Sequence, residues 1–106
     1  MTDGDIPAVH AVIPETKILF RLYVAGNMPN SQRAITNLQS FCRRELPHRH
    51  QIEILDVFAV PNRALEDRIS LTPQLIINTA LGVVRIAGDL SETSALFAAT
   101  IAQGPR

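Results

Sequence analysis

Hydrophobic and polar positions along the chain follow two periods, one typical of strands and the other of helices. Residues 17–25 are almost continuously apolar, which predicts a central strand covered on both faces. In the next segment apolar residues recur every three or four positions, which predicts a helix that ends at Pro47. Asn30 or Ser31 is suited to cap its start. The apolar stripe of this helix consists of Ala34, Ile35, Leu38, Phe41, Cys42 and Leu46.

The middle of the chain predicts three more strands and a short helix. Residues 52–58 have the composition of a strand, although Asp56 interrupts the apolar run. Pro61 and Asn62 are expected to form the turn and the cap of the short helix. That helix is predicted over residues 63–70, and the two remaining strands over residues 74–78 and 83–87.

The last segment, residues 91–102, is rich in alanine and predicts a helix. Ser91 is a plausible N-cap, and Glu92 is favourable near the positive end of the helix dipole. Leu96, Phe97 and Ile101 are expected to be available for packing on the sheet.

The predicted order of elements, β-α-β-α-β-β-α, is that of the thioredoxin fold, which belongs to the α/β class. A chain of 106 residues suits one domain with one core, and we place that domain at residues 17–106. Residues 1–16 contain two prolines, a glycine and no sustained period, so we expect a flexible N-terminal tail.

Charge and composition exclude several classes of function. The 10 basic and 10 acidic residues give zero net charge, so no broad electropositive surface for nucleic acid is expected. No secretory signal is recognisable, and no apolar run reaches the ~20 residues of a membrane span. A single cysteine fits a reducing compartment. We expect a cytoplasmic protein that binds neither membranes nor a cofactor.

The turn after the first predicted strand, residues 26–31, reads GNMPNS. In a thioredoxin-like domain the reactive thiols would lie here, where the helix N-terminus lowers the pKa of a thiol. No thiol is present, and Cys42 lies about three turns further along the buried stripe. Cys42 is therefore expected to be a small buried hydrophobe, and a thiol oxidoreductase is excluded as the function.

Two histidines raise the question of a metal site. His48 and His50 flank Arg49 in a predicted loop, but a metal ion would need further ligands that the spacing does not supply. A solvated loop is the better interpretation, and no metal site is predicted.

Two adjacent carboxylates, Glu66 and Asp67, are candidates for paired acid and base chemistry. Neighbouring helix residues diverge by about 100°, so the two cannot face one substrate. We interpret them as part of an exposed helix face that also carries Arg63 and Arg68. No catalytic residue is predicted.

Thr72 and Pro73 precede the third predicted strand. Thioredoxin-like domains commonly carry a cis proline at this place, and an X-Pro bond adopts that form at a cost of only ~0.5–1 kcal/mol. We expect the cis form, with an ordinary trans turn as the alternative.

Four segments together resemble a known family: LYVAGNMPNSQRAITNL, ILDVF, ALEDRISLTPQL and VVRIAGDLS. They are similar to the KaiB family over residues 17–102. The resemblance implies a non-enzymatic protein that docks on a KaiC-type hexameric ATPase and changes its phosphorylation or ATPase cycle. The setting would be a circadian, timing or stress system, with a KaiA-type protein as a further partner. In this family the turn would supply backbone geometry and part of a protein-binding surface.

The resemblance also marks candidate residues. The candidate partner contacts are Asn27, Asn30, Arg33, Arg68 and Arg85. The candidate fold-determining residues are Thr72, Pro73, Gly88, Asp89, Ala99 and Ile101.

KaiB proteins can occupy two folds, and the resemblance extends that expectation to this chain. One fold is thioredoxin-like; the other rearranges the C-terminal half and assembles into tetramers, so a homodimer or homotetramer is also expected. Here Ala99 and Ile101 replace a glycine and an aspartate of the family pattern, Ile77 replaces a lysine, and residues 79–82 replace a proline run. Because alanine favours a helix over glycine by ~0.5–1 kcal/mol, we expect a substantial thioredoxin-like population.

A second interpretation is a sensory domain that resembles the input domain of a clock-associated histidine kinase. That domain shares the thioredoxin-like fold. The chain ends at Arg106 without a kinase domain, which we take to disfavour this alternative.

Overall fold

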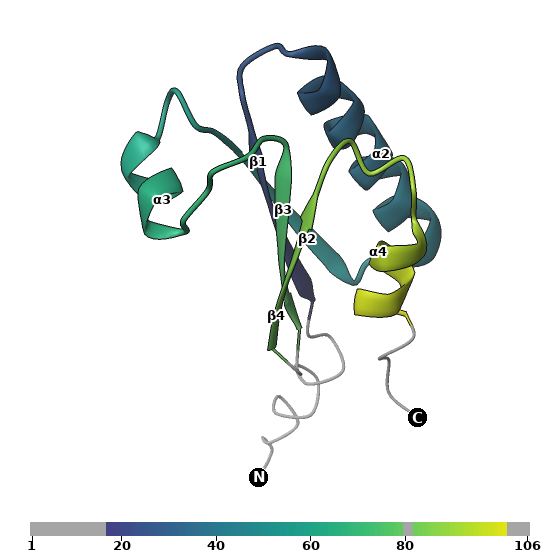
Figure 1. The fold of residues 1–106 in the computed structure, drawn as a ribbon. Helices are drawn as coiled ribbons and strands as arrows, with labels where there is room; N and C mark the ends of the chain where they lie inside the picture. The colour runs from purple at the N-terminus through teal and green to yellow at the C-terminus, as the bar shows by residue number, and fades with distance from the viewer. Residues whose placement is uncertain (1–16, 80–81, 102–106) are drawn as a thin grey trace, which may run out of the picture.

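The computed structural model describes residues 17–79 and 82–101 as a mixed sheet with helices on both faces (Figure 1). The order of strands and helices is the one that the hydrophobic pattern predicts. The elements are β1 (Ile18–Val24), α2 (Pro29–Glu45), β2 (His50–Asp56), α3 (Pro61–Glu66), β3 (Gln74–Thr79), β4 (Gly82–Ala87) and α4 (Ser94–Ala99).

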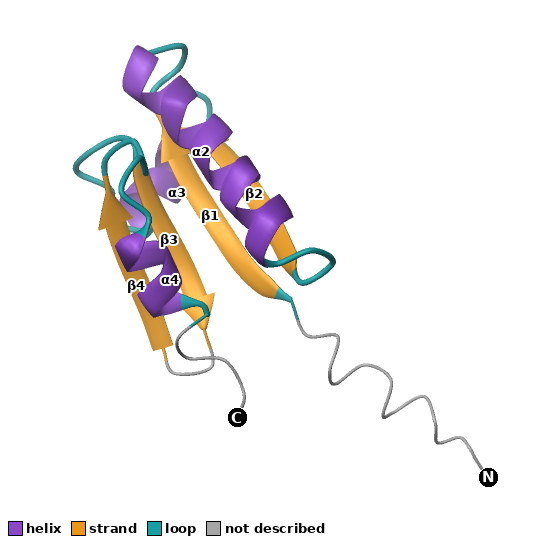
Figure 2. Cartoon of the chain, turned by 90° about the vertical axis from the view of Figure 1, so that its right-hand side faces the viewer, coloured by secondary structure: helices purple, strands orange, loops and turns teal. Residues whose placement is uncertain are grey.

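The sheet has the strand order β2-β1-β3-β4, so β1 is central as its apolar run predicts. β1 and β2 are parallel, with Ile18 beside His50, whereas β3 is antiparallel to both β1 and β4. α2 and α4 lie on one face of the sheet and α3 lies on the other (Figures 1 and 2).

The main core lies between the sheet and the pair α2 and α4. Phe41 of α2 meets Phe97 of α4 edge to face, with 5.1 Å between the ring centroids. Cys42 is buried beside them, as the helical stripe predicts. The other buried members include Phe20, Leu22, Val24, Ala34, Leu38, Leu75, Ile77, Leu90, Leu96 and Ala99.

A second, smaller apolar cluster lies under α3 on the opposite face. Its buried members are Tyr23, Leu55, Ala64 and Ile76. Charged side chains of β1, β2 and β4 lie on the same face: Arg21, Glu53 and Arg85. The two faces of the sheet are therefore stabilised in different ways.

The predicted caps of α2 are wrong. The helix begins at Pro29, Met28 occupies the N-cap position, and no side chain caps it. Asn30 and Ser31 therefore lie inside the first turn, because Pro29 is well suited to the first helical position. The buried Ser31 hydroxyl instead accepts a hydrogen bond from the Ala25 N–H at 3.0 Å.

Two predicted elements in the middle of the chain have boundaries that differ by two to four residues from the structure. β2 ends at Asp56, whose carboxylate accepts a hydrogen bond from the Phe58 N–H at 2.9 Å and so turns the chain away from the sheet. α3 runs from Pro61 to Glu66, so Pro61 and Asn62 belong to the helix and Val60 holds the N-cap position. The predicted turn and cap at these two residues are therefore wrong.

The final helix is shorter than predicted. α4 starts at Ser94 with Thr93 at the N-cap position, so Ser91 does not cap it. Glu92 accepts hydrogen bonds from the Ser94 N–H at 3.3 Å and the Ser94 hydroxyl at 2.8 Å, which places its charge near the helix N-terminus as expected. Ile101 is 40% exposed rather than packed on the sheet. Residue 102 lies outside the described residues.

Candidate functional site

The turn between β1 and α2 is tied to the end of β2 around Gly26. Gly26 has a φ of +53°, a left-handed conformation that glycine adopts without steric cost. Its N–H donates to the Asp56 carboxylate at 3.3 Å, and its carbonyl accepts from the Gln32 side chain at 3.4 Å. A Cβ at position 26 would lie 3.8 Å from the ring of Phe58. That distance is an ordinary van der Waals contact, so the backbone conformation rather than packing explains the glycine.

A shallow pocket of about 300 Å³ lies between this turn and the loop that precedes β3. The Thr72–Pro73 bond is cis, as expected from the order of elements. Pro73 is buried, and its carbonyl accepts a hydrogen bond from the Gly88 N–H at 3.0 Å. The pocket is lined by Ala25, Met28, Pro29, Asn30, Ser31, Thr72 and Pro73.

Asp89 links α2 to the loop between β4 and α4. Its carboxylate accepts from the Ser91 N–H at 3.0 Å and pairs with the Arg33 guanidinium at 3.4 Å. The Ser91 hydrogen bonds, followed by the contact with Arg33, lower the pKa of Asp89. Arg33 also donates to the side chain of Asn30, and Asn37 donates to the Asp89 carbonyl at 2.9 Å. Asp89 therefore connects the polar side chains in the first half of α2 to the loop before α4.

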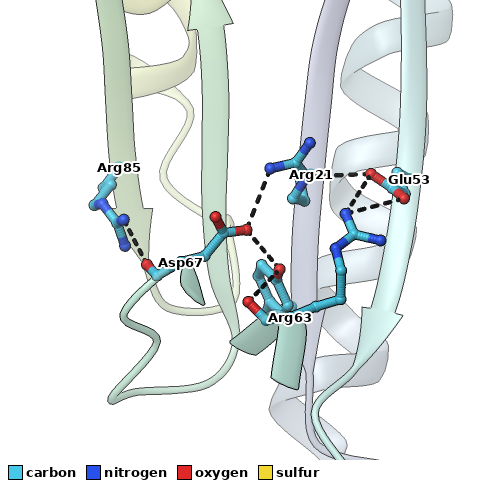
Figure 3. Close-up of polar contacts among 6 residues, drawn as sticks. Arg21, Glu53, Arg63, Asp67 and Arg85 are labelled. Atoms are coloured by element: carbon cyan, nitrogen blue, oxygen red, sulfur yellow. Dashed lines mark hydrogen bonds and ion pairs between the residues drawn. The ribbon is translucent and has the colours of Figure 1, made fainter. Parts of the chain in front are cut away.

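A network of charged side chains lies on the opposite face, between α3 and the sheet (Figure 3). One oxygen of Asp67 accepts from the Tyr23 hydroxyl at 2.5 Å and from Arg21 at 3.2 Å. The Asp67 carbonyl accepts from Arg85 of β4 at 2.5 Å. Asp67 therefore connects the end of α3 to β1 and β4. We call Arg21, Tyr23, Glu53, Arg63, Asp67 and Arg85 the Asp67 network.

Glu53 of β2 completes the Asp67 network. It pairs with Arg21 at 3.1 Å and with Arg63 of α3 at 3.4 Å. The Tyr23 hydroxyl, followed by Arg21 and Arg63, lowers the pKa of Asp67 against the opposing effect of burial. Burial, followed by the contact with Asp67, raises the pKa of Tyr23 to about 12.

The structure corrects the interpretation of Asp67 as part of an exposed helix face. Its side chain is 24% exposed and makes the hydrogen bonds described above, whereas Glu66 is exposed. The sequence carried one weak signal for this network, which is a charged residue, Arg21, inside an otherwise apolar strand. No pattern identified Asp67 as its partner, 46 residues away.

Among the described residues, Cys42 and His50 are not arranged as a reactive site. Burial raises the pKa of the Cys42 thiol to about 12, so the thiolate is scarce at neutral pH. The His50 ring contacts the Leu46 carbonyl at 2.7 Å. Within residues 17–79 and 82–101, no three His, Cys, Asp or Glu side chains are grouped so as to hold a metal ion. Across the same residues, no helix has the length and hydropathy needed to span a membrane.

The structure divides the predicted partner contacts between two sides of the sheet. Asn30 and Arg33 lie together on α2, and Asn27 is exposed in the preceding turn. Arg85 belongs to the Asp67 network on the face that carries α3. Arg68 is exposed after α3 with a φ of +57° and forms no side-chain hydrogen bond with another described residue.

The predicted fold-determining residues lie mainly where the second half of the chain joins the first. Gly88 has a φ of +105°, a conformation that favours glycine, and its N–H bonds to Pro73. Ala99 is the last residue of α4 and is buried in the main core.

Solved structures with the same arrangement define the class of protein. The N-terminal domain of SasA from Synechococcus elongatus has a TM-score of 0.68 and 19% identity, covering 86% of this chain and 90% of that one. The germline-specific thioredoxin Deadhead from Drosophila melanogaster has a TM-score of 0.67 and 12% identity, covering 93% and 94%. The chain is an α/β protein with a thioredoxin-like fold whose first turn lacks a thiol.

Sequence comparison identifies the family. The KaiB domain model matches residues 21–100. The circadian clock protein KaiB3 of Synechocystis sp. is 42% identical over 77 residues, which cover 73% of this chain and 76% of the relative. The circadian clock oscillator protein KaiB of Synechococcus elongatus is 40% identical over 79 residues, which cover 74% and 78%. The chain belongs to the KaiB family.

Proposed function

We propose that this chain is a cytoplasmic regulatory protein of a circadian, timing or stress system that binds a KaiC-type hexameric ATPase. Binding would change the phosphorylation or ATPase cycle of that partner. The observation that carries the proposal is the KaiB domain match over residues 21–100 on a thioredoxin-like fold without a thiol at its first turn. Further partners of the KaiA or histidine-kinase type fit the same proposal.

The side chains around the turn support a protein-binding role for this end of the sheet. Met28 is 59% exposed and Phe58 is 74% exposed, so two large apolar side chains face solvent close to Gly26. Arg33 and Arg68 add exposed positive charge at the start of α2 and after α3. Apolar anchors with arginines beside them are typical of protein interfaces.

Binding of this kind needs no catalytic group in the chain itself. Cys42 is buried with a raised pKa, and Asp67 and Tyr23 are engaged with each other. The proposal therefore assigns all chemistry to the partner ATPase. It also predicts that the protein has no disulfide reductase activity, and insulin reduction that disappears in Cys42→Ser would contradict it.

The decisive experiment measures the affinity of the purified chain for the KaiC-type ATPase of the same organism. Charge reversal at Arg33, Arg68 and Arg85 together is expected to weaken binding by at least about tenfold, because three candidate contacts become repulsive. The matched control is R43E/R44E/R49E, which reverses three exposed arginines at and beyond the other end of α2 and should leave the affinity unchanged. Equal affinity for the triple variant and the wild type would show that the assigned surface is wrong.

A second candidate function is a sensory domain like the input domain of a clock-associated histidine kinase. The observation in its favour is the structural likeness to the SasA N-terminal domain, with a TM-score of 0.68. The higher identity to KaiB proteins favours the first proposal. Binding assays with both purified partners separate the two, since capture of the kinase without any affinity for the ATPase would favour the second.

A further inference from the structure

Basic side chains gather where α2 ends and where β1 and β2 begin. Residues 43–50 read RRELPHRH, and Lys17 lies directly before β1. Glu45 is the acidic residue of this run. Lys17, Arg43, Arg44, His48 and Arg49 are exposed and His50 is half-buried. We call these six residues the basic end.

Backbone contacts bring the residues of the basic end together. The Ile18 N–H donates to the Arg49 carbonyl at 3.0 Å, so Lys17 lies next to Arg49 across the parallel pair β1 and β2. The Arg49 N–H and the His50 ring both contact the Leu46 carbonyl, at 3.0 Å and 2.7 Å. The last turn of α2, with Arg43, is thereby joined to the start of β2.

Among the described residues, three of these side chains have no ion-pair partner. Arg44 pairs with Glu45 at 3.0 Å and lies 6.0 Å from the centroid of the Phe41 ring. Lys17, Arg43 and Arg49 form no ion pair with any other described residue. Arginines in the last turn of a helix interact favourably with the negative end of the helix dipole, which explains the positions of Arg43 and Arg44. Lys17 and Arg49 lie outside the helix and need another explanation.

Distance isolates the basic end from the acidic groups at the far end of the sheet. Asp56 lies near the start of α2 and Asp89 pairs with Arg33, whereas Arg43 lies ten residues, or about 15 Å, further along the helix. Charges in solvent are screened over about 8–10 Å. Although the net charge of the chain is zero, the described residues of the basic end therefore present positive charge to a partner.

We infer that the basic end is a second docking surface, which binds an acidic segment of a partner protein. Arginine guanidinium groups pair with carboxylates through two parallel hydrogen bonds, and two of the three unpaired cations here are arginines. Single-stranded nucleic acid would need exposed aromatic rings for stacking. Phe58 is the exposed aromatic residue among the described ones, and it lies at the opposite end beside Gly26.

The position of this surface has a functional consequence. It lies about one helix length from the turn around Gly26, where Asn27 and Asn30 of the proposed ATPase contacts lie. A partner with an acidic segment can thus bind one end while the other end remains free. The inference does not depend on the proposed function, because it rests on the charges and contacts of the basic end alone.

The test measures binding of the full chain to a fluorescent polyglutamate peptide at low and at physiological ionic strength. We expect binding that weakens with salt, and a loss of at least about tenfold in affinity in the double variant R43E/R49E. The matched control R33E/R68E changes the net charge equally at the other end and should bind as the wild type does. Because Arg43 lies in α2, K17Q/R49Q provides a second variant with both changes outside the helix.

Circular dichroism confirms that each variant is folded before its affinity is compared. Equal losses in R43E/R49E and R33E/R68E would overturn the inference, since net charge alone would then explain binding. Absence of polyglutamate binding would also overturn it. So would tighter binding to a single-stranded oligonucleotide or to anionic lipid vesicles than to polyglutamate. Loss of polyglutamate binding with intact ATPase binding in R43E/R49E would separate this surface from the proposed one.

Discussion

The two faces of the sheet are stabilised by different physics. Under α2 and α4 the side chains are apolar and fully buried, as Phe41 and Leu38 illustrate. Under α3 the apolar cluster is small, and Asp67 joins α3 to β1 and β4 through hydrogen bonds and an ion pair. The free energy gained by burying apolar side chains depends on the buried area and hardly on direction. The free energy of a hydrogen bond or ion pair depends on the distance and the angle between the two groups. We therefore expect the first face to dominate stability and the second to fix the position of α3.

The largest expected effect comes from the apolar face. Phe41→Ala removes a fully buried ring and its edge-to-face contact with Phe97, so the free energy of unfolding should fall by about 3–5 kcal/mol. Urea denaturation measures this loss. The control is Phe58→Ala, which removes a ring that is 74% exposed and should change stability by no more than about 0.5 kcal/mol. Similar losses in both variants would contradict the contrast between buried and exposed rings.

A smaller loss is expected on the polar face. Asp67→Ala removes the charged acceptor that the Tyr23 hydroxyl and the Arg21 guanidinium share, which should cost about 1–3 kcal/mol, although Tyr23 keeps the Arg63 carbonyl and Arg21 keeps Glu53 as partners. Glu66→Ala is the matched control, because the adjacent carboxylate is exposed and its removal should be nearly neutral. Denaturation of both variants at neutral pH measures the difference. If the two variants were equally stable, the Asp67 network would contribute nothing.

The pH dependence of stability sharpens the same comparison. Folding lowers the pKa of Asp67. The contribution of Asp67 to the free energy of unfolding is therefore fully present above the unfolded pKa of about 3.9, and it is lost as pH falls through the folded pKa. The stability difference between the wild type and Asp67→Asn should therefore be constant near neutral pH and shrink in acid. Denaturation midpoints from pH 7 downward measure it. A stability difference between the two proteins that grows in acid would contradict the lowered pKa of Asp67.

The smallest expected effect concerns α4. Ala99→Gly weakens the helix by about 0.5–1 kcal/mol and also removes a buried methyl group, whereas Ala98→Gly weakens it at an exposed position only. Because α4 belongs to the thioredoxin-like fold, Ala99→Gly should reduce the population of that fold more. Backbone chemical shifts of residues 91–101 in the free protein report the population. Strand or coil values in a wild-type tetramer would show that the rearranged fold dominates.

The accuracy of prediction differs between the elements and their ends. The order of strands and helices was predictable because apolar residues repeat with the period of each element. The helix caps were not predictable from the sequence. Asn30, Ser31 and Ser91 all have side chains able to cap a helix, but other contacts determine their roles. Ser31 accepts from Ala25, and the Ser91 N–H donates to Asp89.

The candidate site was predicted in part. The turn around Gly26, the missing thiol and the buried Cys42 followed from the position of residues within predicted elements. The sequence did not predict that the sheet separates Arg33 from Arg85, because the direction of side chains in β4 depends on the register of β4 with β3. Residues 48–50 of the basic end were interpreted as a solvated loop, since their adjacency to Lys17 appears only once β1 and β2 are paired.

The sequence by itself determined the order of the elements, the apolar stripe of α2 and the chemistry that the first turn lacks. These follow from local period and residue type, which need no knowledge of the rest of the chain. Only the tertiary structure decided that Asp67 bonds to Tyr23 and Arg21, which are 44 and 46 residues away. The reason is physical: a hydrogen bond or ion pair needs two groups within a few ångströms in the right direction, and the folded chain alone sets both.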